Sequence, residues 1–243
     1  MPAYFNAGTP LEYRTFDYNA YFDELQKTFG VLSFYKEWKD FWINTFEFHD
    51  QKIKDFIKEH PGSNPAREYM NKKNYDNQVY EIYVFEYVTP GGSFHLHFDI
   101  EKMKYVTYKK LRSVSVQEIP LHELFVDPTT LYIKDKHMQD ERLPFAVEMY
   151  GLQNGDDPCH YLCVDGNKRI QSRIKKDPNI QKIESFVFDI DHWDFMFFFS
   201  LDEYFMGFTR ELQILQYCIR TNRPEREAWE STQSFLQAQY HKE

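Results

Sequence analysis

Apolar residues in the first quarter of the chain recur every three or four positions. They are Phe22, Leu25, Phe29 and Leu32, then Trp38, Phe41, Trp42 and Phe46, and finally Ile53, Phe56 and Ile57. This spacing matches the 3.6-residue repeat of an amphipathic helix. We therefore predict helices here, with Gly30 interrupting the first run and His60-Pro61-Gly62 ending the last.

The next stretch changes to the pattern of β-strands. Residues 78–88 are rich in aromatic and β-branched side chains, residues 94–100 alternate apolar and polar, and residues 89–92 between them are turn formers. Together they predict a β-hairpin, and residues 105–108 predict a third strand.

His95, His97 and Asp99 alternate along the second of these strands, so they share one face of it. We interpret them as a solvated polar face opposite a core face. The alternative is a transition-metal site made of two imidazoles and a carboxylate.

From residue 113 short strands alternate with helices. The pattern predicts strands at 113–119, 144–149, 160–164 and 184–190, a helix at 166–176, and helices at 194–219 and 224–239. The fold class is α+β. We expect a helical and β-hairpin region at 1–112, a mixed small sheet with helices at 113–192, and C-terminal helices at 193–243 packed on the same core.

Composition and charge narrow the class of protein. Aromatic residues make up 19% of the 243 positions, which supports a packed core. The formal net charge is −9, whereas broad nucleic-acid binding needs a positive field, so a nucleic-acid partner is not favoured. Neither a signal peptide nor a membrane-length apolar stretch is visible, and we expect a cytoplasmic protein without a membrane partner. The three cysteines, Cys159, Cys163 and Cys218, are expected to be buried as small apolar residues.

One turn carries candidate chemistry. The predicted strand at 160–164 leads into Asp165-Gly166-Asn167-Lys168-Arg169, where a helix begins at once. The N-terminus of a helix offers unpaired N–H groups and a partial positive charge to an anion. Gly166 allows close approach of a ligand, and Lys168 and Arg169 can neutralise a phosphate. The alternative is that Asp165 caps the helix while both cations are solvated.

The segment YLCVDGNKRIQSR at 161–173 resembles the signature of the ParB/sulfiredoxin superfamily. Weaker matches lie upstream at 115–124 and 143–147 and downstream at 184–190, so the resemblance covers about a third of the chain. It implies a ParB/sulfiredoxin-like fold with a nucleotide phosphate held at the turn by Gly166, Asn167, Lys168 and Arg169.

The chain departs from two branches of that family. Partition proteins carry an acidic residue in a G-E-R-R turn, and sulfiredoxins place their cysteine where Asn167 stands. Chromosome partition and sulfinic acid reduction are therefore not expected. In the remaining reading, Asp165 is the candidate catalytic group for general-base or metal-orienting work.

A second acidic cluster follows the last predicted strand. Asp189 and Asp191 share a face if that strand continues, and their carboxylates could hold Mg²⁺ beside a nucleotide phosphate. The alternative is a helix start at which Asp191 or Asp194 is the cap. Exposed aromatic side chains on the N-terminal helices or on residues 195–208 would mark a surface for a protein partner.

Two functions stay open on this basis. The first is binding of a nucleotide or phosphoester at residues 165–169, with hydrolysis, phosphoryl transfer or nuclease-like chemistry as the enzymatic extension. The second is a non-catalytic interaction or regulatory protein that retains the fold. A third hypothesis is a mobile-element accessory protein that acts on DNA, and the acidic net charge disfavours it.

Overall fold

The computed structural model describes most of the chain and has two compact units. The described residues are 2–6, 13, 16–59, 79–89, 92–127, 140–154 and 157–240. One unit, here the sheet unit, comprises Met1–Leu11, Gly62–Phe85 and Leu96–Phe198, and the other, the helical unit, comprises Glu12–Pro61, Glu86–His95 and Phe199–Glu243. The α+β class is confirmed. The boundaries at 112 and 192 stay predictions.

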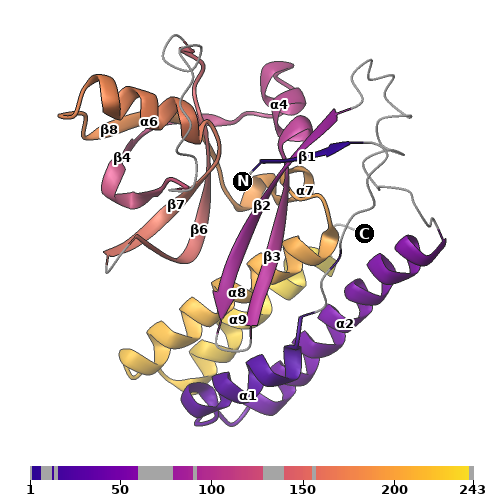
Figure 1. Cartoon of the computed structure of the whole chain (residues 1–243). Coiled ribbons are helices and arrows are strands. Elements are labelled where there is room, and N and C mark those ends of the chain that lie inside the picture. Colours follow the sequence, from indigo (N-terminus) through magenta and orange to yellow (C-terminus); the bar gives the residue numbers. More distant parts are fainter. Residues whose placement is uncertain are drawn as a thin grey trace. The chain divides into compact units, whose positions relative to one another are not determined.

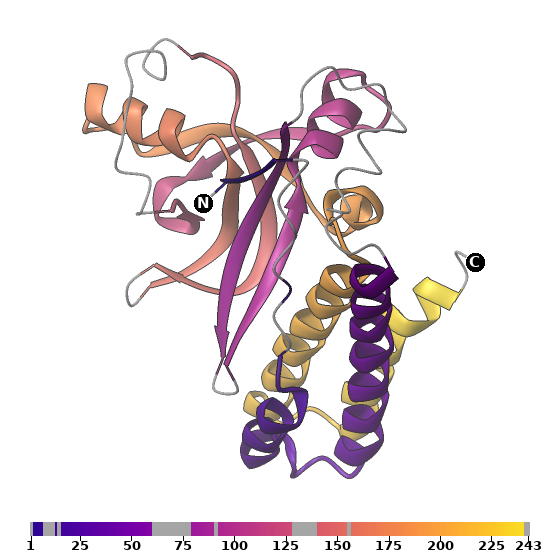
Figure 2. The same cartoon turned by 45° about the vertical axis from the view of Figure 1, so that its right-hand side comes forward.

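The helical unit is built from α1 (Tyr18–Phe29), α2 (Tyr35–Glu59), α8 (Ser200–Arg220) and α9 (Glu225–Tyr240), coloured indigo and yellow in Figure 1. The predicted helices at both ends of the chain are confirmed. Figure 2 shows α2 and α8 running side by side, in agreement with their contacts. The core between these helices is aromatic, and its fully buried members include Phe22, Trp42, Phe46, Phe205 and Phe208.

The helix expected at 194–219 is two helices. The short α7 (Trp193–Met196) ends at Phe197, whose backbone is extended and forms a β-bridge with Phe98. α8 begins only at Ser200. The run of apolar residues continues through the break, so hydrophobic periodicity alone could not reveal it.

A five-stranded mixed sheet forms the centre of the sheet unit. Its strands are β4 (Ser115–Pro120), β5 (Leu124–Phe125), β6 (Phe145–Asn154), β7 (Asp157–Asp165) and β8 (Lys182–Phe188), in the order β4-β8-β6-β7-β5. The four longer strands match predicted ones. β4 is antiparallel to β8 and β6 to β7, whereas β8 is parallel to β6 and β5 to β7. α6 (Asn167–Lys176) buries Ile170 in a core with Cys163, Ile183 and Val187.

A second sheet has the order β1-β2-β3, with β1 (Pro2–Asn6), β2 (Val79–Thr89) and β3 (Gly92–Asp99). The hairpin is confirmed, but the strand predicted at 105–108 is wrong, because those residues end helix α4 (Ile100–Tyr108). Asp99 starts this helix by accepting a hydrogen bond from the backbone N–H of Lys102 at 2.9 Å. Met103 and Val106, at helical spacing, are buried.

The solvated face predicted for β3 is also wrong. His97 is only 7% exposed and Asp99 3%. Asp99 is occupied as the cap of α4, and the carbonyl of His97 accepts from the N–H of Phe198 at 2.8 Å. The prediction for the cysteines is confirmed, since Cys159, Cys163 and Cys218 are free thiols and all are buried. Among the described helices, none has the length and apolar character needed to cross a membrane.

Candidate functional site

Gly166 sits where β7 ends and α6 begins, and the fold itself requires a glycine there. Its φ of +102° lies in the left-handed region, which side chains rarely adopt. A Cβ at this position would lie 2.7 Å from Cβ of Pro144 and 3.0 Å from Nη2 of Arg169. The chain therefore passes the turn in close contact with the segment before β6.

Asn167, the first residue of α6, has a structural role in this turn. Its side-chain oxygen accepts from the backbone N–H of Asp127 at 2.9 Å, and its amide nitrogen donates to the carbonyl of Cys163 at 3.0 Å. The side chain is buried and joins β7 to the segment that follows β5. Both ends of the amide are thus engaged inside the protein, and only 5% of the residue is exposed to a ligand.

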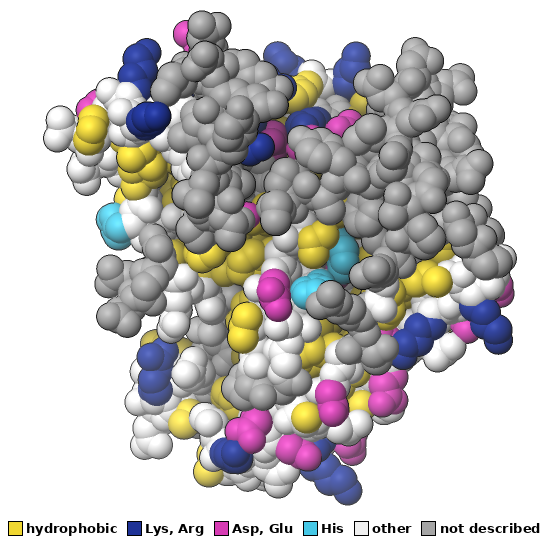
Figure 3. All heavy atoms as spheres, viewed as in Figure 1, with side chains coloured by type: hydrophobic (Ala, Val, Ile, Leu, Met, Phe, Trp, Pro, Cys, Tyr) yellow, Lys and Arg dark blue, Asp and Glu magenta, His cyan; other side chains and the backbone are white. Residues whose placement is uncertain are grey.

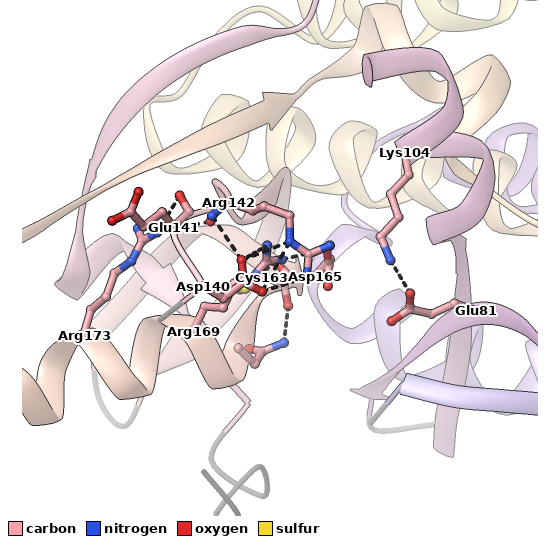
Figure 4. A network of polar contacts seen from close by, with 10 residues as sticks. Glu81, Lys104, Asp140, Glu141, Arg142, Cys163, Asp165, Arg169 and Arg173 are labelled. Carbon is pink, nitrogen blue, oxygen red and sulfur yellow. Dashed lines mark hydrogen bonds and ion pairs between the residues drawn. The ribbon is translucent and has the colours of Figure 1, made fainter. Parts of the chain in front are cut away.

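Arg169 also points into the protein (Figure 4). Its side chain is 5% exposed, and its Nη2 donates to Oδ2 of Asp165 at 2.8 Å. Its Nη1 lies 3.9 Å from Oδ1 of Asp140 and has no hydrogen-bond partner among the described residues. Two of the predicted site residues, Asp165 and Arg169, thus form a mostly buried ion pair.

Lys168 is the cation of the turn that remains available. It is half-buried and forms no ion pair with any described residue. None of the described residues accepts a hydrogen bond from the backbone N–H of Asn167, Lys168 or Arg169, because Gly166 has no side chain to cap the helix. There is also no acidic residue in the first turn of α6. The start of α6 is therefore a positively polarised end beside an ammonium group that no described residue pairs.

Asp165 lies at the centre of a group of charged side chains contributed by α4 and by the segment before β6. Lys104 of α4 forms an ion pair with Glu81 of β2, as Figure 4 shows. Burial alone would lower the pKa of Lys104, but the negative charges of Asp165 and Glu81 outweigh it and raise that pKa. Burial raises the pKa of Tyr108, and the charge of Asp165 adds to this effect. Asp165 thus acts electrostatically on groups from several elements.

Asp140 and Arg142 form a second pair next to Arg169. Arg142 donates from Nη2 to Oδ2 of Asp140 at 2.7 Å, and this hydrogen bond lowers the pKa of Asp140 to about 2. Arg173 of α6 donates to the carbonyls of Glu141 and Arg142 at 3.2 and 3.1 Å. The carboxylate of Asp140 is therefore ionised and is neutralised by Arg142.

Cys163 is the only cysteine among these residues, and it is poorly placed for nucleophilic chemistry. Burial, followed by the charge of Asp165, raises the pKa of its thiol well above the usual value. A neutral buried thiol is a weak nucleophile.

The acidic cluster after β8 is organised around His192. The carboxylate of Asp189 accepts from the N–H of Asp191 at 3.0 Å and lies 2.7 Å from Nδ1 of His192. It caps the short 3-10 helix η2 (Ile190–His192), while Nε2 of His192 lies 2.9 Å from the carbonyl of Ser113. The carboxylate of Asp191 is exposed. Across the described ranges there is no group of three or more His, Cys, Asp or Glu side chains that could hold a metal ion.

Several residues around the turn were not anticipated from the sequence. They are Glu81, Lys104, Asp140 and Arg142, which come from segments far from residues 165–169 in the chain. Basic side chains of α6 beyond the turn gather at the upper left of Figure 3, over that helix. The pair between Asp165 and Arg169 did have a sequence signal, because residues four apart at the start of a helix can meet.

Comparison with known proteins adds no assignment: no family model, no curated protein and no solved structure matches this chain.

Proposed function

We propose that the sheet unit binds the phosphate group of a nucleotide or another phosphoester at the start of α6, in the manner that the resemblance to the ParB/sulfiredoxin superfamily implies. The observation that carries the proposal is the set of three backbone N–H groups, of Asn167, Lys168 and Arg169, without an acceptor among the described residues. Such N–H groups are costly to leave without a partner and suit an anion.

The position of Lys168 supports the same ligand. A cation in the first turn of a helix is disfavoured by the helix dipole, by about 0.3–1 kcal/mol. Lys168 has no described acidic partner to offset this effect. A bound phosphate would remove the conflict, because it would contact the N–H groups and the ammonium group together.

The proposed phosphate site is smaller than the one predicted from the sequence. Lys168 and the backbone of residues 167–169 contact the phosphate, while Asn167 and Arg169 hold the turn in shape through their side chains. Asp165 has an indirect role, since its carboxylate fixes Arg169. An enzymatic extension would be hydrolysis or phosphoryl transfer through Asp165, with Mg²⁺ at Asp189 and Asp191. It would require Asp165 to release Arg169 and Asp189 to release His192.

A non-catalytic interaction protein is the second candidate, and one observation favours it. The side chains of Asn167 and Arg169 both form their hydrogen bonds with other residues of the protein. The same turn would then be only a feature of the fold. The two candidates differ in whether a phosphate binds at all.

Calorimetric titration with inorganic phosphate and with nucleotides, each with and without Mg²⁺, tests the proposal. We expect binding that Lys168→Ala weakens by about ten- to a hundredfold, since one charge-assisted hydrogen bond is worth about 1.5–3 kcal/mol. Lys175→Ala is the matched control, because Lys175 is exposed at the other end of α6. Equal effects of the two substitutions would point to non-specific charge attraction, and the proposal would be wrong.

A further inference from the structure

Glu211 is a carboxyl group in the core of the helical unit. It lies on α8, and only 1% of the residue is exposed. Its Oε2 accepts hydrogen bonds from Nε1 of Trp38 at 2.7 Å and from Nε1 of Trp42 at 2.9 Å. Both tryptophans lie on α2, four residues apart and so on one face of that helix. The carboxyl group thus joins α8 to α2.

The two oxygens of this carboxyl group are not equivalent. Oε2 accepts both indole hydrogens, whereas Oε1 is buried and has no hydrogen-bond partner among the described residues. Around them the surfaces are apolar: the ring of Phe208 stacks on Trp38 and meets Trp42 edge-on, each at 5.4 Å between centroids. A negative charge spread over both oxygens is poorly compensated there.

Few of the described charged groups act on Glu211. Among them, Arg210, the neighbouring residue on α8, is the one whose charge lowers the pKa of Glu211. Around the two tryptophans on α2, Glu37 and Asp40 are exposed, and Lys39 is paired with Asp23 of α1 at 3.0 Å. Two ion pairs of α9 are at the surface: Glu227 with Arg223, which precedes the helix, and Arg226 with Glu230.

We propose that Glu211 makes the helical unit a proton-linked switch, in which α2 and α8 pack closely around the neutral carboxyl group and loosen when it ionises. In the neutral form the proton sits on Oε1, and Oε2 acts as a carbonyl oxygen that accepts both indole hydrogens. In the ionised form Oε1 needs a hydrogen-bond donor, and water can supply that hydrogen bond. Water reaches it only if the contact between the tryptophans and α8 opens.

The transition falls in the neutral pH range. Burial raises the pKa of Glu211 to about 7. The hydrogen bonds from the two indoles and the charge of Arg210 lower this pKa, but by less than burial raises it. A group whose pKa is raised on folding binds its proton more tightly in the folded protein. It therefore stabilises the closed form at acidic pH and loses that effect as the pH rises through about 7.

The indole N–H resonances of the intact wild-type chain test this switch directly. The chain has four tryptophans, and we expect the signals of Trp38 and Trp42 to titrate together with a midpoint near 7. Trp193 and Trp229, which donate no hydrogen bond to Glu211, serve as internal references. Spectra recorded from about pH 5.5 to about pH 8.5 span the transition on both sides of neutrality.

Two variants separate Glu211 from other titrating groups. Glu211→Gln keeps the shape and stays neutral, so the titration of Trp38 and Trp42 should vanish. Glu227→Gln, at an exposed position of α9, should leave it unchanged. The proposal is overturned if neither indole signal titrates in the wild type, or if both still titrate in Glu211→Gln. Should that variant fail to fold, a wild type whose two indole signals stay unchanged across this range would still overturn the proposal.

Discussion

Arg169 donates a hydrogen bond from Nη2 to Oδ2 of Asp165 at 2.8 Å, so two residues of the predicted phosphate turn bind each other. The guanidinium group lies in the interior, and among the described residues Nη1 has no hydrogen-bond partner and lies 3.9 Å from Oδ1 of Asp140. A buried pair of this kind costs a protein much more when one partner is removed than an exposed pair does. The turn is therefore fixed by charges within the protein before any ligand binds.

Removal of Arg169 should destabilise the sheet unit. Arg169→Ala leaves Asp165 without its partner, and we expect the free energy of unfolding in urea to fall by about 3–5 kcal/mol. Arg226→Ala, which breaks an exposed pair with Glu230, should leave the free energy of unfolding nearly unchanged. A loss of phosphate binding by Arg169→Ala without a loss of stability would show that Arg169 is a ligand residue.

Gly166 should tolerate a side chain less well than Gly92 does. Both glycines have a positive φ, +102° and +124°, so alanine is strained at either position. At Gly166 the new Cβ would also meet Pro144 at 2.7 Å, whereas at Gly92 the nearest atom is 3.9 Å away. Thermal unfolding of the two alanine variants should rank Gly166→Ala as clearly less stable. Equal losses would mean that the segment before β6 moves aside without cost.

Asp99 should stabilise the protein as the N-terminal cap of α4. Asp99→Ala removes the acceptor for the N–H of Lys102, and such a loss typically costs about 0.5–2 kcal/mol. Asp99→Asn retains a capping oxygen and should recover most of this stability, as chemical denaturation can measure. An asparagine variant as unstable as the alanine variant would show that the charge of Asp99 matters more than its hydrogen bond.

His49 should make the helical unit less stable in acid. Its Nδ1 lies 2.9 Å from Oγ of Ser200, and burial, followed by the charge of Lys52, lowers its pKa to about 4. Its pKa is thus lower when folded than when unfolded, so stability falls as the pH drops from about 6.5 towards 4. His49→Gln should remove this part of the pH dependence of the melting temperature. Glu211 has the opposite effect, because it stabilises the helical unit at acidic pH. The variants His49→Gln and Glu211→Gln each remove one of these two contributions.

The sequence revealed elements whose periodicity is clear and missed those decided by tertiary contacts. α1, α2 and the strands β4, β6, β7 and β8 follow the 3.6- and 2-residue repeats, so they were predicted. Residues 105–108 resemble a strand in composition, but the cap at Asp99 and the burial of Met103 and Val106 make them helical. Composition could not show that the neighbouring structure would bury His97.

The position of the turn was predicted from the sequence, whereas the contacts of its side chains were not. The pattern of strand, glycine and helix located the turn correctly at Gly166. Whether Arg169 faces a ligand or an internal acid depends on Asp140 and on the direction of its side chain, which one local segment does not specify. The same holds for Asn167, whose partner Asp127 lies 40 residues away in the chain.

The most direct test of the central claim is a titration of the wild-type protein with inorganic phosphate, followed by its backbone amide resonances. We expect the amides of Asn167, Lys168 and Arg169 to show the largest shifts, and these shifts to need a higher phosphate concentration in Lys168→Ala but not in Lys175→Ala. If those three amides do not respond to phosphate or to any nucleotide at millimolar concentrations (about −4 kcal/mol of binding free energy), the start of α6 is not an anion site and the proposed function is wrong.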